Sequence, residues 1–113
     1  MEHCIRSWGE YWVLEAASNH KVRRILVNTK GCLSYKYQDY RDIWIMILAG
    51  VGHIASDGIV NDYKEGDFII IPKGIKHSIE NSSEEPLVFI EIQHGTYFGK
   101  EDFVLIEENN QST

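Results

Sequence analysis

The chain lacks the features of a secreted or membrane-inserted protein. It has two cysteines among 113 residues, Cys4 and Cys32, and they form no C-x-x-C pair, so we expect reduced thiols rather than a disulfide framework. The longest apolar run, "IWIMILAGVG", is far shorter than the roughly 20 residues of a membrane-spanning helix. The first residues show no charged-then-apolar signal pattern. These absences predict a cytoplasmic protein with no membrane partner.

Positive charge is also scarce. The chain has 11 Lys and Arg against 17 Asp and Glu, which gives a formal net charge of -6. A nucleic-acid binder gains affinity from cations that neutralise phosphates, so this balance argues against nucleic acid as a partner. We interpret the one short basic cluster, Lys21, Arg23 and Arg24, as the solvated edge of a strand.

The length and composition of the chain are those of one globular domain. With 113 residues, 43% of them hydrophobic, it can bury one core but not two. We expect a single domain over 1–113, with a core from about 6 to 108 and a disordered tail at about 109–113.

Short segments rich in β-branched and aromatic residues alternate with turn signals, and no segment shows an apolar repeat of 3.6 residues. This pattern predicts an all-β sandwich or barrel. The predicted strands are 11–15, 22–27, 33–38, 43–48, 53–55, 68–71, 77–80, 87–93 and 103–106. Between two of them, Asp57-Gly58 fits a tight hairpin turn.

The strand "IWIMIL" at 43–48 is apolar at every position, so both of its faces should be covered. One face can meet the interior of the fold. The other requires either more of the same chain, as in the core strand of a monomer, or a second subunit, as in a homodimer. The sequence leaves both alternatives open.

The segment "GDFIIIPKGIKHSIEN" carries a spaced motif of Gly66, Pro72, Gly74, His77 and Asn81. A glycine suits a tight turn at the first position, and Pro72 is suited to end a strand. Gly74 lets the chain reverse before His77 enters the next strand.

This motif resembles the second motif of the cupin superfamily. "RSWGEY", "KVRRI", "PLVFIEIQ" and "GTYFGKEDF" extend the resemblance to the cupin domain of type II mannose-6-phosphate isomerases, from about Arg6 to Glu108. The resemblance implies a single-domain double-stranded β-helix, or jelly-roll barrel, in which His77 points inward and ligates a divalent metal. It also implies interconversion of mannose 6-phosphate and fructose 6-phosphate. In this family the domain is often the C-terminal half of a bifunctional enzyme that also makes GDP-mannose, whereas we expect the present chain to stand alone.

The residues depart from the family at the metal site. The resemblance implies a Gln and a His two residues apart and a Glu five residues later, but the corresponding positions here are Lys36, Gln38 and Ile43. A protonated lysine has no lone pair, and isoleucine cannot ligate. We therefore expect no resident metal or other cofactor, with a divalent metal on Gln38 and His77 as the alternative. Leu105 stands where the family has an arginine associated with the isomerase site, so isomerase activity should be weak or absent.

The same strand positions predict a ligand site instead. Residues two apart share a face of a strand, so Lys36 and Gln38 are expected to point together toward His77. The ammonium group would then replace the metal as a fixed charge for a small anionic sugar or carboxylate. Alternatively, Lys36 extends to the mouth of a neutral barrel. Glu91 could face inward, as a general base or a partner for Lys36, or outward into solvent.

The predicted ligand-binding residues are Lys36, Gln38, His77 and Gln93, and the catalytic candidates are Lys36, His77 and Glu91. Of the other histidines, His53 is expected to be exposed and His94 to lie near the barrel mouth, whereas His3 and His20 receive no role.

Three functions follow from this reading. The first is a mannose-6-phosphate isomerase-like cupin of sugar-phosphate and polysaccharide-precursor metabolism. The second is a metal-free binding module for an anionic sugar or carboxylate. The third is a dimeric structural or interaction protein that keeps only the fold.

Overall fold

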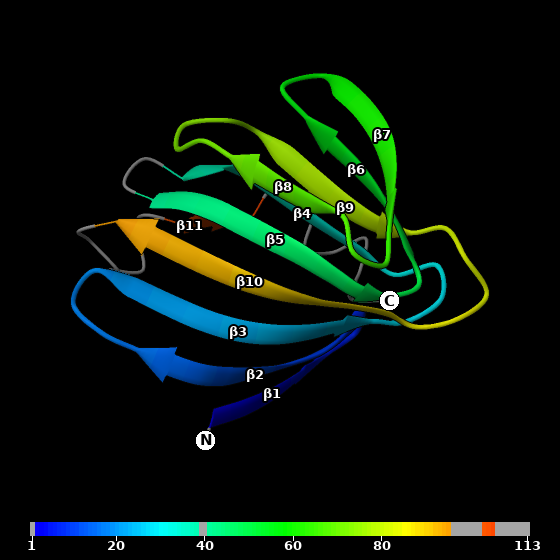
Figure 1. The fold of residues 1–113 in the computed structure, drawn as a ribbon, viewed down its shortest axis with the longest axis horizontal. Helices are drawn as coiled ribbons and strands as arrows, with labels where there is room; N and C mark the ends of the chain where they lie inside the picture. Colours follow the sequence, from blue (N-terminus) through cyan, green and yellow to red (C-terminus); the bar gives the residue numbers. More distant parts are fainter. Residues whose placement is uncertain (1, 39–40, 96–102, 106–113) are drawn as a thin grey trace.

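The structure is a computed structural model that describes residues 2–38, 41–95 and 103–105, with side chains for 2–33 and 41–95. Two antiparallel sheets make up this part of the chain. The six-stranded sheet contains, in spatial order, β1 (Glu2–Arg6), β2 (Gly9–Ala16), β3 (His20–Val27), β10 (Leu87–Gly95), β5 (Arg41–Ala49) and β8 (Phe68–Ile71) (Figure 1). The five-stranded sheet contains β11 (Phe103–Leu105), β4 (Cys32–Gln38), β9 (His77–Asn81), β6 (Val51–Ser56) and β7 (Ile59–Lys64).

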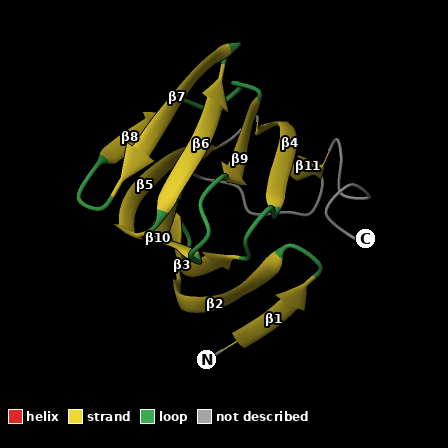
Figure 2. Ribbon diagram, turned by 90° about the vertical axis from the view of Figure 1, so that its right-hand side faces the viewer, coloured by secondary structure: helices red, strands yellow, loops and turns green. Residues whose placement is uncertain are grey.

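The two sheets face each other, and the β1–β2 hairpin extends the six-stranded sheet at its margin (Figure 2). This arrangement confirms the predicted all-β jelly-roll fold. Within the described strands, no ladder of hydrogen bonds joins the two sheets, so they form a sandwich of two open sheets instead of a closed barrel. The described residues also contain no helix that could cross a membrane.

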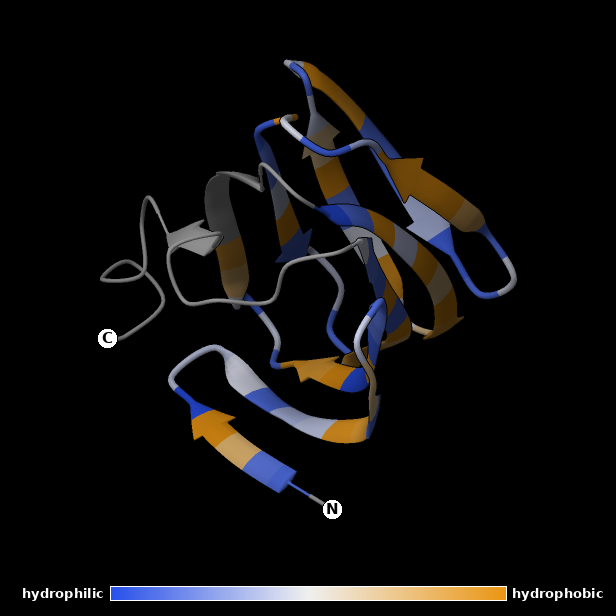
Figure 3. Ribbon diagram, turned by 90° about the vertical axis from the view of Figure 1, so that its left-hand side faces the viewer, coloured by the Kyte–Doolittle hydropathy of each residue, from blue (hydrophilic) through white to orange (hydrophobic). Residues whose placement is uncertain are grey.

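Alternation of apolar and polar residues along the strands builds the core. Figure 3 shows apolar and hydrophilic bands following one another along the ribbons. Because successive side chains in a strand point to opposite faces, one set of residues from each sheet meets between the sheets. The buried cluster comprises Trp8, Ile25, Val27, Leu33, Ile43, Ile45, Ile47, Ile54, Ile71, Ile79, Leu87 and Phe89.

The turns of the predicted motifs have the backbone that their residues favour. Asp57 and Gly58 have φ angles of 54° and 81° and link the paired residues Ser56 and Ile59, as a tight hairpin requires. Gly66 and Gly74 have φ angles of 90° and 82°, in the left-handed region that favours glycine. Pro72 directly follows the last residue of β8. The predicted turn chemistry of this segment is confirmed.

Each predicted strand overlaps an observed one, although residue 106 and the expected tail at 109–113 lie outside the described residues. The prediction missed β1 and β7. Five of the six residues of β7 and four of the five of β1 are exposed, so neither strand has the inward apolar face that the prediction relied on.

The apolar strand β5 is covered on one face only. Ile43, Ile45 and Ile47 point into the core with at most 1% exposure, whereas Met46 and Leu48 on the other face are 37% and 43% exposed. Among the described residues, no other part of the chain covers the outer face at Met46 and Leu48, which contradicts the alternative of a strand buried on both faces within one chain. The homodimer alternative remains a prediction.

Candidate functional site

The inward face of β10 changes from apolar to polar halfway along the strand. The apolar side chains of Leu87 and Phe89 are fully buried, and Glu91 and Gln93 continue the same face with 2% exposure each. The neighbouring strands β3 and β5, and β9 of the facing sheet, place buried polar side chains at the same end of the interior. We name the set Arg23, Arg41, His77, Glu91 and Gln93 the polar end.

Hydrogen bonds link four members of the polar end in a row. Arg23 Nε donates to Glu91 Oε1 at 2.7 Å, and Gln93 Nε2 donates to the same oxygen at 2.8 Å. Arg41 Nη1 in turn donates to Gln93 Oε1. A buried charge is costly unless it is paired and hydrogen-bonded, so the strand register that places Glu91 opposite Arg23 is essential to this arrangement.

The buried position of Arg23 corrects the interpretation of the basic cluster as a solvated strand edge. Its side chain is 8% exposed, and its guanidinium lies 4.5 Å from the centre of the Tyr11 ring. Arg24, the next residue, points to the opposite face of β3 and stacks over Trp12 at 4.9 Å. The prediction failed because alternation along a strand separates two adjacent cations that look alike in sequence.

Burial and charge act in opposite directions on Glu91. Burial by itself raises the pKa of this carboxyl, but the charge of Arg23 and the hydrogen bonds from Arg23 and Gln93 bring the pKa below its ordinary value. Glu91 is therefore ionised at neutral pH. It is poorly suited to act as a general base, because a carboxylate held by these donors has little tendency to take up a proton.

His77 begins β9 and belongs to the opposite sheet. Its side chain is buried, and Nδ1 lies 3.4 Å from the Ile75 carbonyl oxygen. Burial lowers the pKa of His77, with a smaller opposing effect from the Ile75 carbonyl and from the charge of Glu91. His77 therefore presents a neutral imidazole at neutral pH, which can donate one hydrogen bond and accept another.

The described residues do not fit the divalent metal that the resemblance implies. No group of three or more His, Cys, Asp or Glu side chains comes together within 2–33 and 41–95 in a way that could hold a metal ion. Glu91 is engaged by Arg23, and Ile43, where the family has a carboxylate, is a core residue with 1% exposure. Two buried guanidinium groups at the same end would also oppose a cation.

Three of the predicted site residues can now be compared with the structure. The structure brings His77, Glu91 and Gln93 together and resolves the open question about Glu91 in favour of the inward orientation. The β4 backbone pairs Tyr35 with His77, one residue before Lys36. The side chains of Lys36 and Gln38 lie outside the described residues, as does that of Leu105, so their predicted roles stay predictions.

Sequence reasoning missed Arg23 and Arg41 as site residues. A signal for Arg23 was available: it lies two residues before Ile25 and four before Val27, so it shares their inward face once a strand is assumed. Arg41 gave no such signal, because it lies just before the predicted strand 43–48, whereas in the structure it is the first residue of β5.

His53 and His94 do not belong to the buried polar end. The His53 side chain is 44% exposed and contacts Asp62 Oδ1 at 2.6 Å, in agreement with the expected surface position. His94 is exposed on the outer side of β10 and stacks on Trp44 with ring centres 5.1 Å apart.

Asn81, the last residue of the sequence motif, has a structural role. It is fully buried, and Nδ2 donates to the carbonyl oxygens of Val27 at 2.9 Å and Glu85 at 2.8 Å. Its Oδ1 accepts hydrogen bonds from the backbone N–H and the hydroxyl of Ser83. One side chain thus ties the end of β3 to the loop between β9 and β10.

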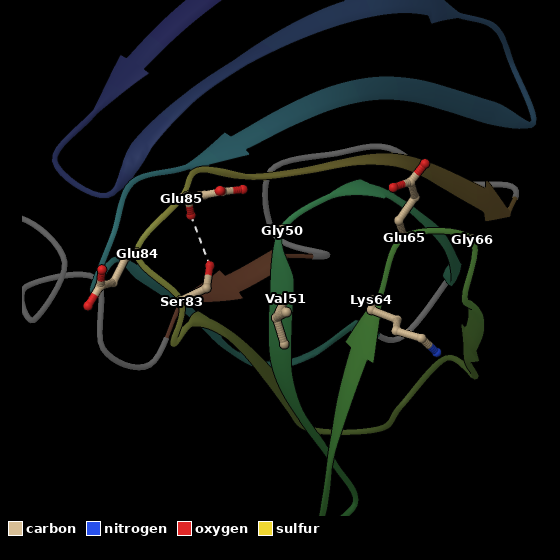
Figure 4. A pocket seen from close by; sticks show the side chains of 8 residues that line it. All are labelled: Gly50, Val51, Lys64, Glu65, Gly66, Ser83, Glu84 and Glu85. Carbon is tan, nitrogen blue, oxygen red and sulfur yellow. Dashed lines mark hydrogen bonds between the residues drawn. The ribbon is translucent and has the colours of Figure 1, made fainter.

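An open depression of about 780 Å³ lies near Gly50, at the opposite end of β5 from Arg41 (Figure 4). Its lining residues are Gly50, Val51, Lys64, Glu65, Gly66, Ser83, Glu84 and Glu85. Three carboxylates against one ammonium would repel an anion, so this depression does not suit the predicted ligand.

Solved structures define the class of protein. The chain superposes with a TM-score of 0.81 on an oxalate decarboxylase variant from Bacillus subtilis, at 16% identity over 93% of this chain and 30% of that one. An RmlC-like cupin from Shewanella frigidimarina gives a TM-score of 0.74 at 15% identity, over 88% of this chain and 84% of the other. At these identities the likeness concerns the fold alone, and that fold is the cupin jelly roll.

Sequence comparison then identifies the family. Residues 1–108 match the family described as "Mannose-6-phosphate isomerase C-terminal", and the chain belongs to it. The mannose-1-phosphate guanylyltransferase ManC of Salmonella typhimurium is 32% identical over 103 residues, and a mannose-1-phosphate guanylyltransferase of Klebsiella pneumoniae is 34% identical over the same length. Both matches cover 91% of this chain and 22% of the relative, so the chain spans about a fifth of those proteins.

Proposed function

We propose that this chain is a mannose-6-phosphate isomerase-like cupin of sugar-phosphate and polysaccharide-precursor metabolism that binds a small anionic sugar or carboxylate at its polar end. Metal-dependent isomerase turnover is expected to be weak or absent. The observation that carries the proposal is the placement of Arg23 and Arg41 inside the sandwich, joined through Glu91 and Gln93.

The chemistry of these groups suits a phosphate or carboxylate. A guanidinium presents several donors in a planar fork that matches both anions, and it keeps its charge at every physiological pH. The neutral imidazole of His77 adds a donor or acceptor from the facing sheet. Because these side chains are buried, water screens their charges less, and each interaction is stronger than it would be in water.

The relatives support a sugar-phosphate ligand. The guanylyltransferases are named for mannose 1-phosphate, and a similar Xanthomonas campestris protein is named for xanthan biosynthesis. The present chain matches only about a fifth of their length, so a nucleotidyl-transfer activity is no part of the proposal.

Ligand-induced stabilisation tests the proposal. The purified chain is melted with mannose 6-phosphate, fructose 6-phosphate, GDP-mannose, inorganic phosphate and citrate, with mannose as the neutral comparison. A ligand present at 100 times its dissociation constant adds about 2.7 kcal/mol to the free energy of unfolding. We expect a saturable shift with at least one anionic sugar or carboxylate and none with mannose.

Two substitutions and one matched control locate the site. Arg41→Gln is expected to reduce the ligand-induced shift, measured against its own ligand-free melting curve, and Arg6→Gln on the exposed strand β1 is expected to leave it intact. Lys36→Met tests the predicted ammonium contact. If Arg41→Gln and Lys36→Met both retain the full shift, the ligand does not bind at the polar end.

A coupled isomerase assay tests the catalytic part separately. We expect no interconversion of mannose 6-phosphate and fructose 6-phosphate above the uncatalysed background, with or without added zinc or manganese. Turnover that a chelator abolishes and a metal restores would contradict the loss of the metal site.

A further inference from the structure

The outer face of the six-stranded sheet carries two apolar rows that cross three strands. In the first row Ile92 of β10 pairs with Trp44 of β5, which pairs with Ile70 of β8. In the second, Ile90, Met46 and Phe68 follow the same order. These six residues define what we name the outer apolar face.

Three of the six residues are exposed in a single chain, and Trp44, Ile90 and Ile92 are half-buried. Met46 is 37% exposed, Phe68 51% and Ile70 55%. The inner face of the same strands already forms the core, so a surface strand would normally carry polar residues on its outer side. Strands that are apolar on both faces are typical of sheets covered on both sides, and a contiguous exposed apolar patch marks an interaction site.

The margin of the outer apolar face is polar and carries both signs of charge. Arg24, opposite Ile90 on β3, stacks on Trp12, and Trp12 also stacks on His3 with ring centres 4.7 Å apart. His3 is hydrogen-bonded to Glu10 at 2.7 Å. An apolar centre with a rim of mixed charge is the usual anatomy of a protein–protein interface. A rim with both signs can pair with a second copy of itself.

The size of the sheet suits a dimer. Six strands about 4.8 Å apart and roughly 20 Å long span on the order of 500 Å² in projection, and side-chain relief increases the accessible area. A standard interface removes about 800 Å² per partner from solvent. The net charge of -6 and the acidic groups in the rim disfavour an anionic lipid surface as the occupant.

We propose that the outer apolar face is the contact surface of a homodimer in which the six-stranded sheets of two copies pack face to face around a two-fold axis. Two sheets can pack in this way with their strands nearly aligned or nearly perpendicular. Two-fold symmetry places the same apolar rows on both sides of the contact, so the interface is self-complementary.

Sedimentation of the full chain from about 1 to 100 µM tests the proposal. We expect a dimer with twice the 13.1 kDa mass of one chain. Ile70→Lys and Met46→Lys each place a charge within the contact on both subunits. Each is expected to raise the dimer dissociation constant by about 30-fold or more, the effect of losing an interface residue worth at least 2 kcal/mol.

Ile59→Lys is the matched control. Ile59 is an equally large and more exposed residue, 66% against 55% for Ile70, but it lies on β7 of the other sheet. It is expected to leave the dissociation constant within about threefold, a change below 1 kcal/mol. Circular dichroism melts establish that all three variants fold.

The proposal is overturned by a wild-type monomer across this range, whether the outer apolar face then binds lipid vesicles, another protein or nothing. A dimer that survives both Ile70→Lys and Met46→Lys overturns it as well. So does a dimer that Ile59→Lys dissociates equally well, because its contact would then lie on the other sheet.

Discussion

Removal of the charge on Glu91 should destabilise the fold far more than removal of a similar charge at the surface. The change is Glu91→Gln, which keeps the shape of the side chain and an oxygen that can accept from Arg23 Nε. In the native chain the ion-paired side chains are 8% and 3% exposed and 2.7 Å apart, so water screens them little. Loss of one partner of such a buried pair costs about 3–5 kcal/mol.

We expect a cost near the lower limit, about 3 kcal/mol, because the amide retains one hydrogen bond. For a domain of this size that corresponds to a fall in Tm of roughly 12 °C. Urea unfolding followed by tryptophan fluorescence measures the free energy directly. It also shows through the m-value whether the variant still unfolds in one step.

Glu15→Gln is the matched control. Glu15 Oε2 contacts His20 Nε2 at 2.5 Å, but its side chain is 61% exposed, and exposed ion pairs contribute about 0–1 kcal/mol. The double variant Arg23→Met with Glu91→Leu is expected to be more stable than Glu91→Gln, since it removes both charges together. If Glu91→Gln and Glu15→Gln have the same small effect, the charge pair does not hold the polar end together.

Three further changes probe other features. Burial lowers the pKa of His77 in the folded chain. As the pH falls, the unfolded chain therefore takes up a proton at His77 before the folded chain does, and the free energy of unfolding should decrease below about pH 6.5. His77→Gln, unfolded in urea at pH 5 to 7.5, should make the free energy of unfolding depend less on pH in this range, and an unchanged dependence would contradict the buried, neutral state of His77. The lowered pKa of Glu91 should cause a further loss of stability at more acidic pH. Asn81→Ala leaves two carbonyl oxygens without a buried donor and should lower the free energy of unfolding by about 2–3 kcal/mol. The control Asn61→Ala, on the exposed strand β7, should lower it by less than about 0.5 kcal/mol, and equal effects would refute the structural role of Asn81. Gly66→Ala should cost about 1–2 kcal/mol from its φ of 90° alone, since no atom lies within 4 Å of an added Cβ, and a neutral result in thermal melts would show that the turn adjusts.

The sequence predicts the strands well where burial is one-sided. Ile43, Ile45 and Ile47 alternate with residues of the outer face, and the turn residues Asp57 and Gly66 mark where strands end. The prediction fails at β1 and β7 because most of their residues are exposed. Such strands are held by backbone pairing to a neighbour, and pairing between distant segments leaves no local pattern.

The candidate site is less predictable than the fold. The motif around His77 predicts an inward side chain there, and alternation places Glu91 and Gln93 on one face of a strand, because those signals lie within one strand each; whether that face points inward was left open by the sequence. The partners Arg23 and Arg41 depend on which strands lie beside β10, and that neighbourhood is set by the long-range topology β3-β10-β5. No spacing in the sequence encodes it.

The division of the β10 inner face into an apolar half and a polar half has an evolutionary consequence. Leu87 and Phe89 anchor the strand in the hydrocarbon core, while Glu91 and Gln93, two and four residues beyond Phe89, form the hydrogen bonds with Arg23 and Arg41. Substitutions confined to the second half can change the polar groups of the interior while the first half keeps the sheets together. A strand divided in this way can therefore accept new polar side chains at one end without losing the apolar contacts that fold the domain.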